Sequence, residues 1–150
     1  MSQTFTGRTF QLNLTKFKGQ GASLRVAIVV AKAMTAPTEL RVSKDRKLLT
    51  ITFPAHAPVE LSAELLRVVS PSAEVQGHSP EQRVTVPGKR NVAISEIIPT
   101  GNYAVRIVFD DGHGTGIFTW DYLHRMAHDK DAMWQSYLGE LAAKGLSRDR

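Results

Sequence analysis

Two carboxylates and an imidazole lie within four residues of one another, at Asp110, Asp111 and His113. Such a set could bind a divalent cation or exchange protons with a substrate, because carboxylate oxygens and imidazole nitrogens serve both purposes. The same residues surround Asp111-Gly112, a dipeptide typical of tight hairpin turns. In a turn the Asp side chains accept backbone N–H groups and the His faces solvent. Spacing alone leaves both interpretations open and favours the turn.

A second cluster comes later in the chain, where Asp121, His124 and His128 follow one another at helical spacing. Residues three and four apart share one face of a helix, so these side chains could contribute to a metal site. That site would need a further ligand from elsewhere in the chain, and without one the histidines are solvent-exposed. The Glu of a zinc-protease His-Glu-x-x-His helix is absent, which excludes that class.

Other classes of chemistry lack their residues. The chain has no cysteine, which excludes disulfides, thiolate zinc sites, iron–sulfur clusters held by its own thiolates and cysteine nucleophiles. This absence is consistent with a cytoplasmic location. No phosphate-binding glycine motif is present. Ser70 and Ser72 flank Pro71 and stand in no Gly-x-Ser-x-Gly elbow. We therefore recognise no nucleophile–base pair and expect no enzyme.

The net charge of +5 comes entirely from the first 33 residues, which hold five bases and no acid. The remaining 14 bases balance all 14 acids, so the body of the protein gives no electrostatic reason to bind nucleic acid. No apolar run approaches the ~20 residues of a membrane span. We divide the chain into a basic extension, 1–33, and a domain, 34–150. The extension could be a disordered tail, an element that docks on the domain, or a non-native sequence, with Met34 as the true start.

Hydrophobic periodicity predicts about six short, mostly antiparallel strands. Alternation over 39–53 around the polar turn Lys44-Asp45-Arg46 indicates a β-hairpin. Ser62 is a plausible N-cap for a short helix that Pro71 stops. The other expected strands are 84–86, 92–97, 103–110 and 117–120.

Two helices are expected at the C-terminal end. Thr119 can cap a helix that begins near Trp120, and Asp129 or Asp131 can cap a second one after His128. The second helix carries an amphipathic stripe and ends at Gly145. The predicted fold class is α+β: a small, mainly antiparallel β-sheet domain with a short inserted helix and two C-terminal helices.

These residues resemble the gamma-butyrobetaine hydroxylase-like N-terminal domain family over about 37–123. Domains of this family occur at the N-terminus of the hydroxylases, as stand-alone bacterial proteins, and fused to P-loop iron–sulfur carriers. The segments that carry the resemblance are 65–75, Gly101-Asn102-Tyr103, Phe109-Asp110-Asp111-Gly112-His113 and 116–123.

In the hydroxylases the resembling domain holds a structural zinc through three cysteines and one histidine. The resemblance places those cysteine positions at Ser70, Ser72 and Val75, and the histidine at His113. Because serine is a poor zinc ligand and valine is none, we expect that zinc to be absent. A rebuilt iron or zinc site could use His113 with His78 and nearby carboxylates, Asp111 and Glu74.

The sequence and the resemblance together predict a non-catalytic accessory or interaction domain. By association with the fused carriers, we expect a link to iron or iron–sulfur metabolism and a protein partner, for which such a carrier is the candidate. The alternative is a mononuclear metal-binding protein that uses His113, His78 and Asp111. We expect binding neither to nucleic acid nor to membranes.

Overall fold

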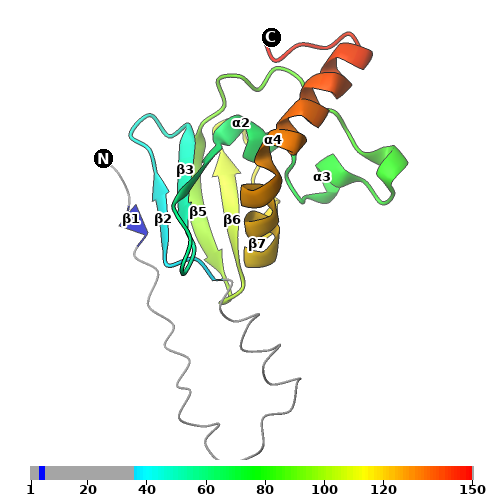
Figure 1. Cartoon of the computed structure of the whole chain (residues 1–150). Coiled ribbons are helices and arrows are strands. Elements are labelled where there is room, and N and C mark those ends of the chain that lie inside the picture. Colours follow the sequence, from blue (N-terminus) through cyan, green and yellow to red (C-terminus); the bar gives the residue numbers. More distant parts are fainter. Residues whose placement is uncertain (1–3, 6–35, 150) are drawn as a thin grey trace, which may run out of the picture.

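The computed structural model describes residues 4–5 and 36–149 and contains two antiparallel sheets. The first sheet has the strand order β1-β2-β3-β4, in which every neighbouring pair is antiparallel. The bounds are β1 Thr4–Phe5, β2 Glu39–Val42, β3 Leu48–Thr52 and β4 Val59–Ser62. Figure 1 shows these strands beside those of the second sheet.

The second sheet has the order β5-β6-β7 and supplies the turn that carries His113. Its strands are β5 Ile94–Thr100, β6 Ala104–Phe109 and β7 Ile117–Thr119. The register between β5 and β6 shifts at Ser95, where a bulge lies between Ile94 and Glu96. The guanidinium of Arg46, in the β2–β3 turn, donates to the carbonyls of Ile94 and Ser95 and so joins the two sheets at this bulge.

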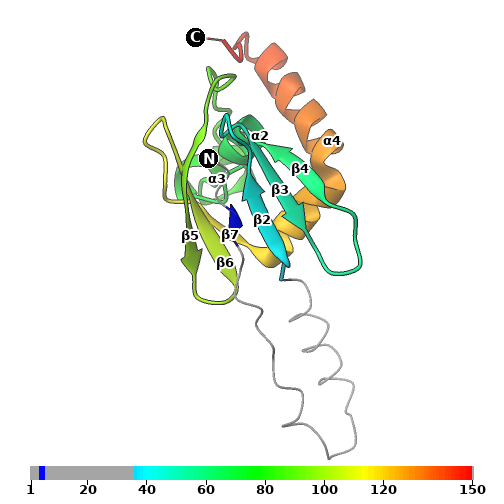
Figure 2. The same ribbon diagram turned by 90° about the vertical axis from the view of Figure 1, so that its left-hand side faces the viewer.

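Three α-helices and one 3₁₀ helix complete the described fold. They are α2 Ala63–Val68, α3 Ala73–Gln76, the 3₁₀ helix η2 Pro80–Gln82 and α4 Trp120–Ala143. Ser62 and Thr119 cap α2 and α4, because each side-chain oxygen accepts the N–H three residues later. Helix α4 runs beside both sheets (Figure 1, Figure 2) and contacts β4 of one and β7 of the other.

One hydrophobic core joins the sheets, α2 and α4. Its fully buried members include Leu49 and Ile51 from β3, Ile107 from β6, and Met126 and Tyr137 from α4. Alternate residues of β2, β3 and β6 enter this core, as the period of two in the sequence predicts. Within the described ranges, no helix has the length and hydrophobicity that crossing a bilayer requires.

The α+β fold class is confirmed, and two of the expected details are wrong. One continuous helix of 24 residues replaces the two expected C-terminal helices. Residues 84–86 form no strand, and the fourth strand of the first sheet is Val59–Ser62 instead. The expectations for the extension 1–33 fall outside the described residues, apart from Thr4 and Phe5, which pair with β2.

Candidate functional site

The residues that could take part in chemistry gather where the segment after α2 meets the turn between β6 and β7. Ser70 and Ser72 lie between α2 and α3, and both are buried. The Gln76 side chain holds this segment by donating to the carbonyl of Ser70 at 2.9 Å. The Tyr122 hydroxyl of α4 donates to the carbonyl of Val69. The segment is therefore fixed from both sides and presents Ser70 to the β6–β7 turn.

The β6–β7 turn is closed by its own backbone. Phe109 and His113 pair through a 2.8 Å bond from the Phe109 N–H to the His113 carbonyl. Gly112 has φ 89, which favours glycine, and its N–H donates to the Phe109 carbonyl. The Asp111 carboxylate accepts the N–H of His113 at 3.1 Å. This geometry confirms a tight turn, but it points His113 inward, against the expectation of a solvent-facing ring.

His113 is buried, and both of its ring nitrogens have partners. Nδ1 lies 3.1 Å from Oε2 of Glu74, and Nε2 lies 3.0 Å from Oγ of Ser70. The other Glu74 oxygen accepts the Thr115 hydroxyl at 3.1 Å. A carboxylate only accepts, so Nδ1–H donates to Glu74 and Nε2 accepts the Ser70 hydroxyl. We call Ser70, His113 and Glu74 the relay, because the three side chains form one chain of hydrogen bonds.

The environment of His113 keeps its imidazole neutral. Burial lowers the pKa of His113 below its ordinary value, and the nearby Arg67 charge lowers it further. The Glu74 and Asp111 carboxylates raise the pKa but do not offset those two effects. When the ring is neutral, its single proton lies on Nδ1, because that nitrogen faces the Glu74 carboxylate.

Asp111 is neutralised by two cations rather than facing the ring of His113. Its Oδ2 lies 2.8 Å from Nε of Arg67 and 2.5 Å from Nζ of Lys89. Burial raises the pKa of Asp111, but the hydrogen bonds from Lys89, from the His113 N–H and from Arg67 outweigh it and lower the pKa to about 2. Asp111 is therefore an anion that anchors the turn to α2 and to residue 89.

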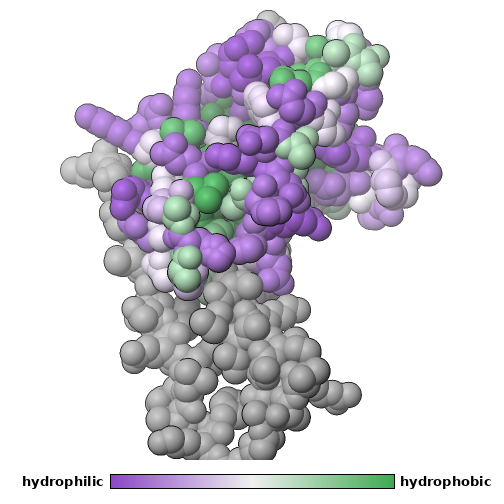
Figure 3. All heavy atoms as spheres, viewed as in Figure 1, coloured by the Kyte–Doolittle hydropathy of each residue, from purple (hydrophilic) through white to green (hydrophobic). Residues whose placement is uncertain are grey.

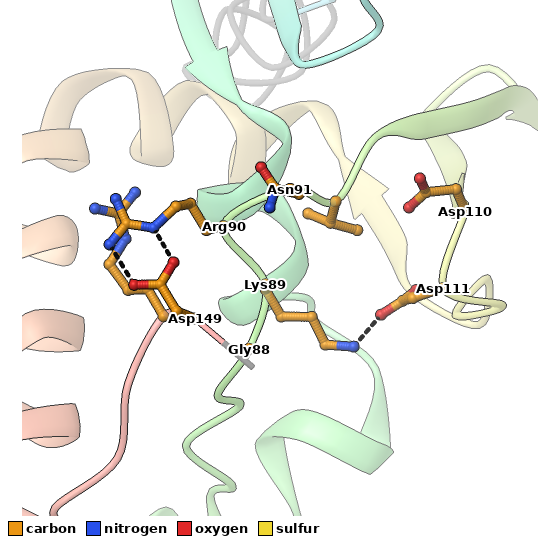
Figure 4. Close-up of a pocket in the computed structure, with 9 residues that line it drawn as sticks. Gly88, Lys89, Arg90, Asn91, Asp110, Asp111 and Asp149 are labelled. Carbon is orange, nitrogen blue, oxygen red and sulfur yellow. Dashed lines mark hydrogen bonds and ion pairs between the residues drawn. The ribbon is translucent and has the colours of Figure 1, made fainter.

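A hollow of about 360 Å³ lies beside the Lys89–Asp111 pair. Residues 88–92, the two aspartates of the turn, and residues 148 and 149 line it. Figure 4 shows the Lys89 side chain reaching Asp111 across one side of the hollow, and Arg90 paired with Asp149 on the other. The ionic groups drawn as bonded there satisfy one another, which leaves the hollow without a strong preference for an anion or a cation.

The relay has the order of a nucleophile, a base and an acid, which the sequence alone did not reveal. A nucleophilic serine must meet its substrate, whereas the exposed fraction of Ser70 is 0%. Gly116, the residue just before β7, closes the site on another side. A Cβ at that position would lie 2.2 Å from Oγ of Ser70. Ser70 is thus enclosed by the protein itself, and in this structure the relay joins two segments of the chain.

The residues expected to ligate a metal have different surroundings and do not form one cluster. His113 lies in the relay, Asp111 binds the two cations, and His78 is exposed after α3. Among the described residues, no three His, Cys, Asp or Glu side chains are placed to share a metal ion. The use of His113, His78 and Asp111 as metal ligands stays a prediction.

The positions of the family's zinc ligands do converge in space. Ser70 contacts His113, and the Ser72 N–H lies 3.4 Å from Oγ of Ser70. The donors do not suit zinc, however, because Val75 is apolar and buried, and the Ser70 hydroxyl is already bonded to His113. Glu74, which the sequence offered only as a carboxylate ligand for a rebuilt metal site, is hydrogen-bonded to the His113 ring. Arg67, Lys89 and Gly116 were not expected, and no local pattern marks them.

The solved structures that are similar to this chain include two solution structures and one crystal structure. Two proteins solved by NMR in solution share 48% and 46% of the sequence, with TM-scores of 0.68 and 0.62. The first match covers 77% of this chain and 91% of the other, and the second covers 73% and 81%. The third is a crystal structure of a protein of unknown function from Acidithiobacillus ferrooxidans that belongs to the DUF971 family. It shares 36% identity over 63% of this chain and 96% of its own, with a TM-score of 0.52.

No curated protein matches the chain. The family model described as gamma-butyrobetaine hydroxylase-like, N-terminal, matches residues 40–124. The matched range runs from β2 into α4 and includes the relay and both cations that bind Asp111. The chain belongs to the gamma-butyrobetaine hydroxylase-like N-terminal domain family.

Proposed function

We propose that this protein is a non-catalytic accessory domain that presents one surface to a protein partner in the cytoplasm. We call this surface the relay face and define it as residues 73–84 and 110–116. The observation that carries the proposal is the relay itself, which fastens these two segments together from inside. The relay side chains thereby bond to one another within the protein, while the outer side of the relay face remains exposed.

The exposed side of the relay face is polar with one apolar point. Glu74, His78 and Glu81 are exposed. Figure 3 shows mainly hydrophilic residues over the projecting part that contains α3 in Figure 1. Val84 is 49% exposed, and its N–H donates to the carbonyl of Val75 at 2.8 Å, which fixes it beside α3. A fixed apolar side chain among polar ones is typical of the anchor of a small interface.

The class of partner rests on the family resemblance. Because domains that resemble this one are fused to P-loop iron–sulfur carriers, we propose such a carrier as the partner, and iron or iron–sulfur metabolism as the setting. The polar character of the relay face favours a reversible complex that weakens as salt rises.

Site-specific crosslinking tests the relay face. A photoreactive residue is placed at His78 or Glu81, and a control is placed at Lys44, which is exposed in the β2–β3 turn on the other side of the molecule (Figure 1). We expect the same carrier to be crosslinked from His78 and Glu81 in native cells, and not from Lys44.

A matched pair of surface variants separates binding from folding. Val84→Asp places a charge at the proposed anchor, whereas Tyr103→Asp does so at a residue that is 53% exposed in the β5–β6 turn. We expect V84D to abolish the crosslinks and Y103D to leave them unchanged. Equal crosslinking from Lys44, or full crosslinking in V84D, would contradict the proposed surface. Capture of a different protein through the relay face would contradict only the class of partner.

A further inference from the structure

Two histidines from different parts of the chain, His56 and His124, lie ring to ring outside the relay. His56 lies in the loop between β3 and β4, and His124 lies in the second turn of α4. Their ring centres are 5.6 Å apart, and the His124 ring also packs edge-on against Phe53 at 4.9 Å. The pair belongs to neither the relay nor the relay face.

The loop holds His56 in place through a tight turn. The His56 N–H donates to the Phe53 carbonyl at 3.2 Å, and Ala55 between them has φ 60. Pro54 followed by a residue with positive φ is the pattern of a type II turn, in which proline fixes the first angle. The position of His56 over the end of β3 is therefore set by the backbone.

The separation of the two rings matches that of imidazoles that share one metal ion. An imidazole that binds at about 2.0–2.1 Å has its ring centre roughly 3.2 Å from the metal, so two rings at a tetrahedral angle have centres roughly 5 Å apart. Histidine rings rotate easily about their last side-chain bond, so small rotations bring one nitrogen of each ring to a common point. His56 is exposed and His124 is partly exposed, so both are accessible to an ion from solvent.

A metal site on the histidines of α4 requires a ligand from another segment, and His56 is in the right place to be that ligand. Asp121 lies one turn before His124 on the same face of the helix. Its negative charge offsets the positive end of the helix dipole, which otherwise disfavours a cation there.

We propose that His56 and His124 form a two-histidine site for a divalent transition-metal ion such as Zn²⁺, with water as the remaining ligands. Imidazole nitrogen is a preferred donor for Zn²⁺, Ni²⁺ and Cu²⁺, and a poor one for Mg²⁺ and Ca²⁺. Structural zinc sites hold their ion with four protein ligands, so a site with two exchanges its metal readily.

Calorimetric titration of the untagged full chain with ZnCl₂, above the ordinary pKa of imidazole, tests the site. The variants are His56→Phe and His124→Phe, which remove the donor nitrogens but keep an aromatic ring at each position. The matched control is His128→Phe, at an exposed histidine outside the proposed pair, and His78→Phe reports separately on the site predicted around His113. We expect each of the first two variants to weaken Zn²⁺ binding at least about tenfold, and the control to bind as the wild type does.

The variant His128→Phe distinguishes this site from one along α4. His128 lies one turn after His124, with 84% of its side chain exposed, and it is not part of the proposed pair. Loss of affinity in His128→Phe but not in His56→Phe would overturn the proposal, as would a wild type that binds no Zn²⁺. Thermal unfolding of each variant verifies the fold, and His56→Phe alone decides the question if His124→Phe is unstable, because His56 is exposed.

Discussion

His113 ties together two segments that are about forty residues apart in the chain, through Ser70 on one nitrogen and Glu74 on the other. Hydrogen bonds of buried side chains contribute modestly when made and cost more when one partner is removed. The relay therefore acts as a fastening between the two segments. Its neutral histidine also makes the fastening sensitive to acid.

Stability should fall as the pH falls below the ordinary histidine pKa. The folded protein holds the pKa of His113 below the 6.5 of a free side chain, so the unfolded chain takes up this proton first. The contribution of His113 is complete above pH 6.5 and is lost between 6.5 and the lower pKa of the folded state. Urea unfolding at a series of pH values measures this. His113→Gln should flatten that part of the curve, whereas His128→Gln, at an exposed site, should leave it unchanged.

Gly116→Ala should destabilise the protein by about 2 kcal/mol, within the range for overpacking of a close contact. The new Cβ would lie 2.2 Å from Oγ of Ser70, an atom that its hydrogen bond with His113 holds in place. Ser70→Ala removes the obstructing atom, so the double variant should lose less stability than the sum of the two single ones. Strict additivity in urea unfolding would show that the close approach has no energetic consequence.

The sequence could predict only part of this site. The Asp-Gly turn is a local signal, and the family resemblance alone is enough to place Ser70 near His113. The partners of Asp111 carry no such signal, because Arg67 and Lys89 are 44 and 22 residues away in the chain. No motif indicates that Gly116 is needed because the site beside Ser70 has no room for a Cβ, rather than because of its backbone angles.

Among the elements, α4 shows how tertiary packing overrides local helix-capping signals. Asp129 and Asp131 are good N-caps, but neither stops a helix that has already begun, since Asp costs only a few tenths of a kcal/mol in a helix interior. Buried residues lie on both sides of that point, Met126 before it and Tyr137 after it, so a break would pull one half away from the core. The expectation of two helices failed because capping residues indicate only where a helix can start.

Two glycines of this region should respond to alanine in opposite directions. Gly139 lies inside α4, and a Cβ at that position would meet no atom within 4 Å, so Gly139→Ala should stabilise the protein by about 0.5–1 kcal/mol. Gly145 has φ 63 after the helix, so Gly145→Ala should destabilise it by about 1 kcal/mol. Thermal unfolding measures both; shifts of the same sign would contradict the assigned end of α4.

The absence of the strand expected at 84–86 has a different cause. Val84 and Val86 alternate as a strand would, but Val84 is exposed and its N–H bonds to α3. Residues 59–62 pair with β3 although Pro58 precedes them. Periodicity reports which side chains could face a core, whereas a strand also needs a neighbouring edge, which the sequence does not reveal.

At the scale of the whole molecule, the segment after α4 folds back onto the body. The carbonyls of Ser147 and Arg148 accept the N–H groups of Gly88 and Arg90. The Arg148 guanidinium binds both oxygens of Glu64 and lies 4.8 Å from the centre of the Trp134 ring. Glu64 is buried, and its partner comes from 84 residues away, so no sequence pattern could link the two.

Removing this partner should be costly. Arg148→Met leaves the Glu64 carboxylate buried without its cation, and we expect a loss of about 2–3 kcal/mol in urea unfolding. Arg90→Ala breaks an exposed pair with Asp149 and should cost less than about 1 kcal/mol. The double variant Glu64→Leu, Arg148→Met should recover much of the loss. Similar costs for Arg148→Met and Arg90→Ala would show that burial of Glu64 adds nothing.

The placement of α4 also sets the order in which a growing chain can fold. All the described strands precede residue 120, so both sheets leave the ribosome before the helix that covers them. Until Leu123, Met126, Tyr137 and Leu141 are synthesised, the apolar sides of β4 and β7 lack their cover. Nascent chains that stop before α4 should therefore bind chaperones, and release should coincide with the emergence of that helix.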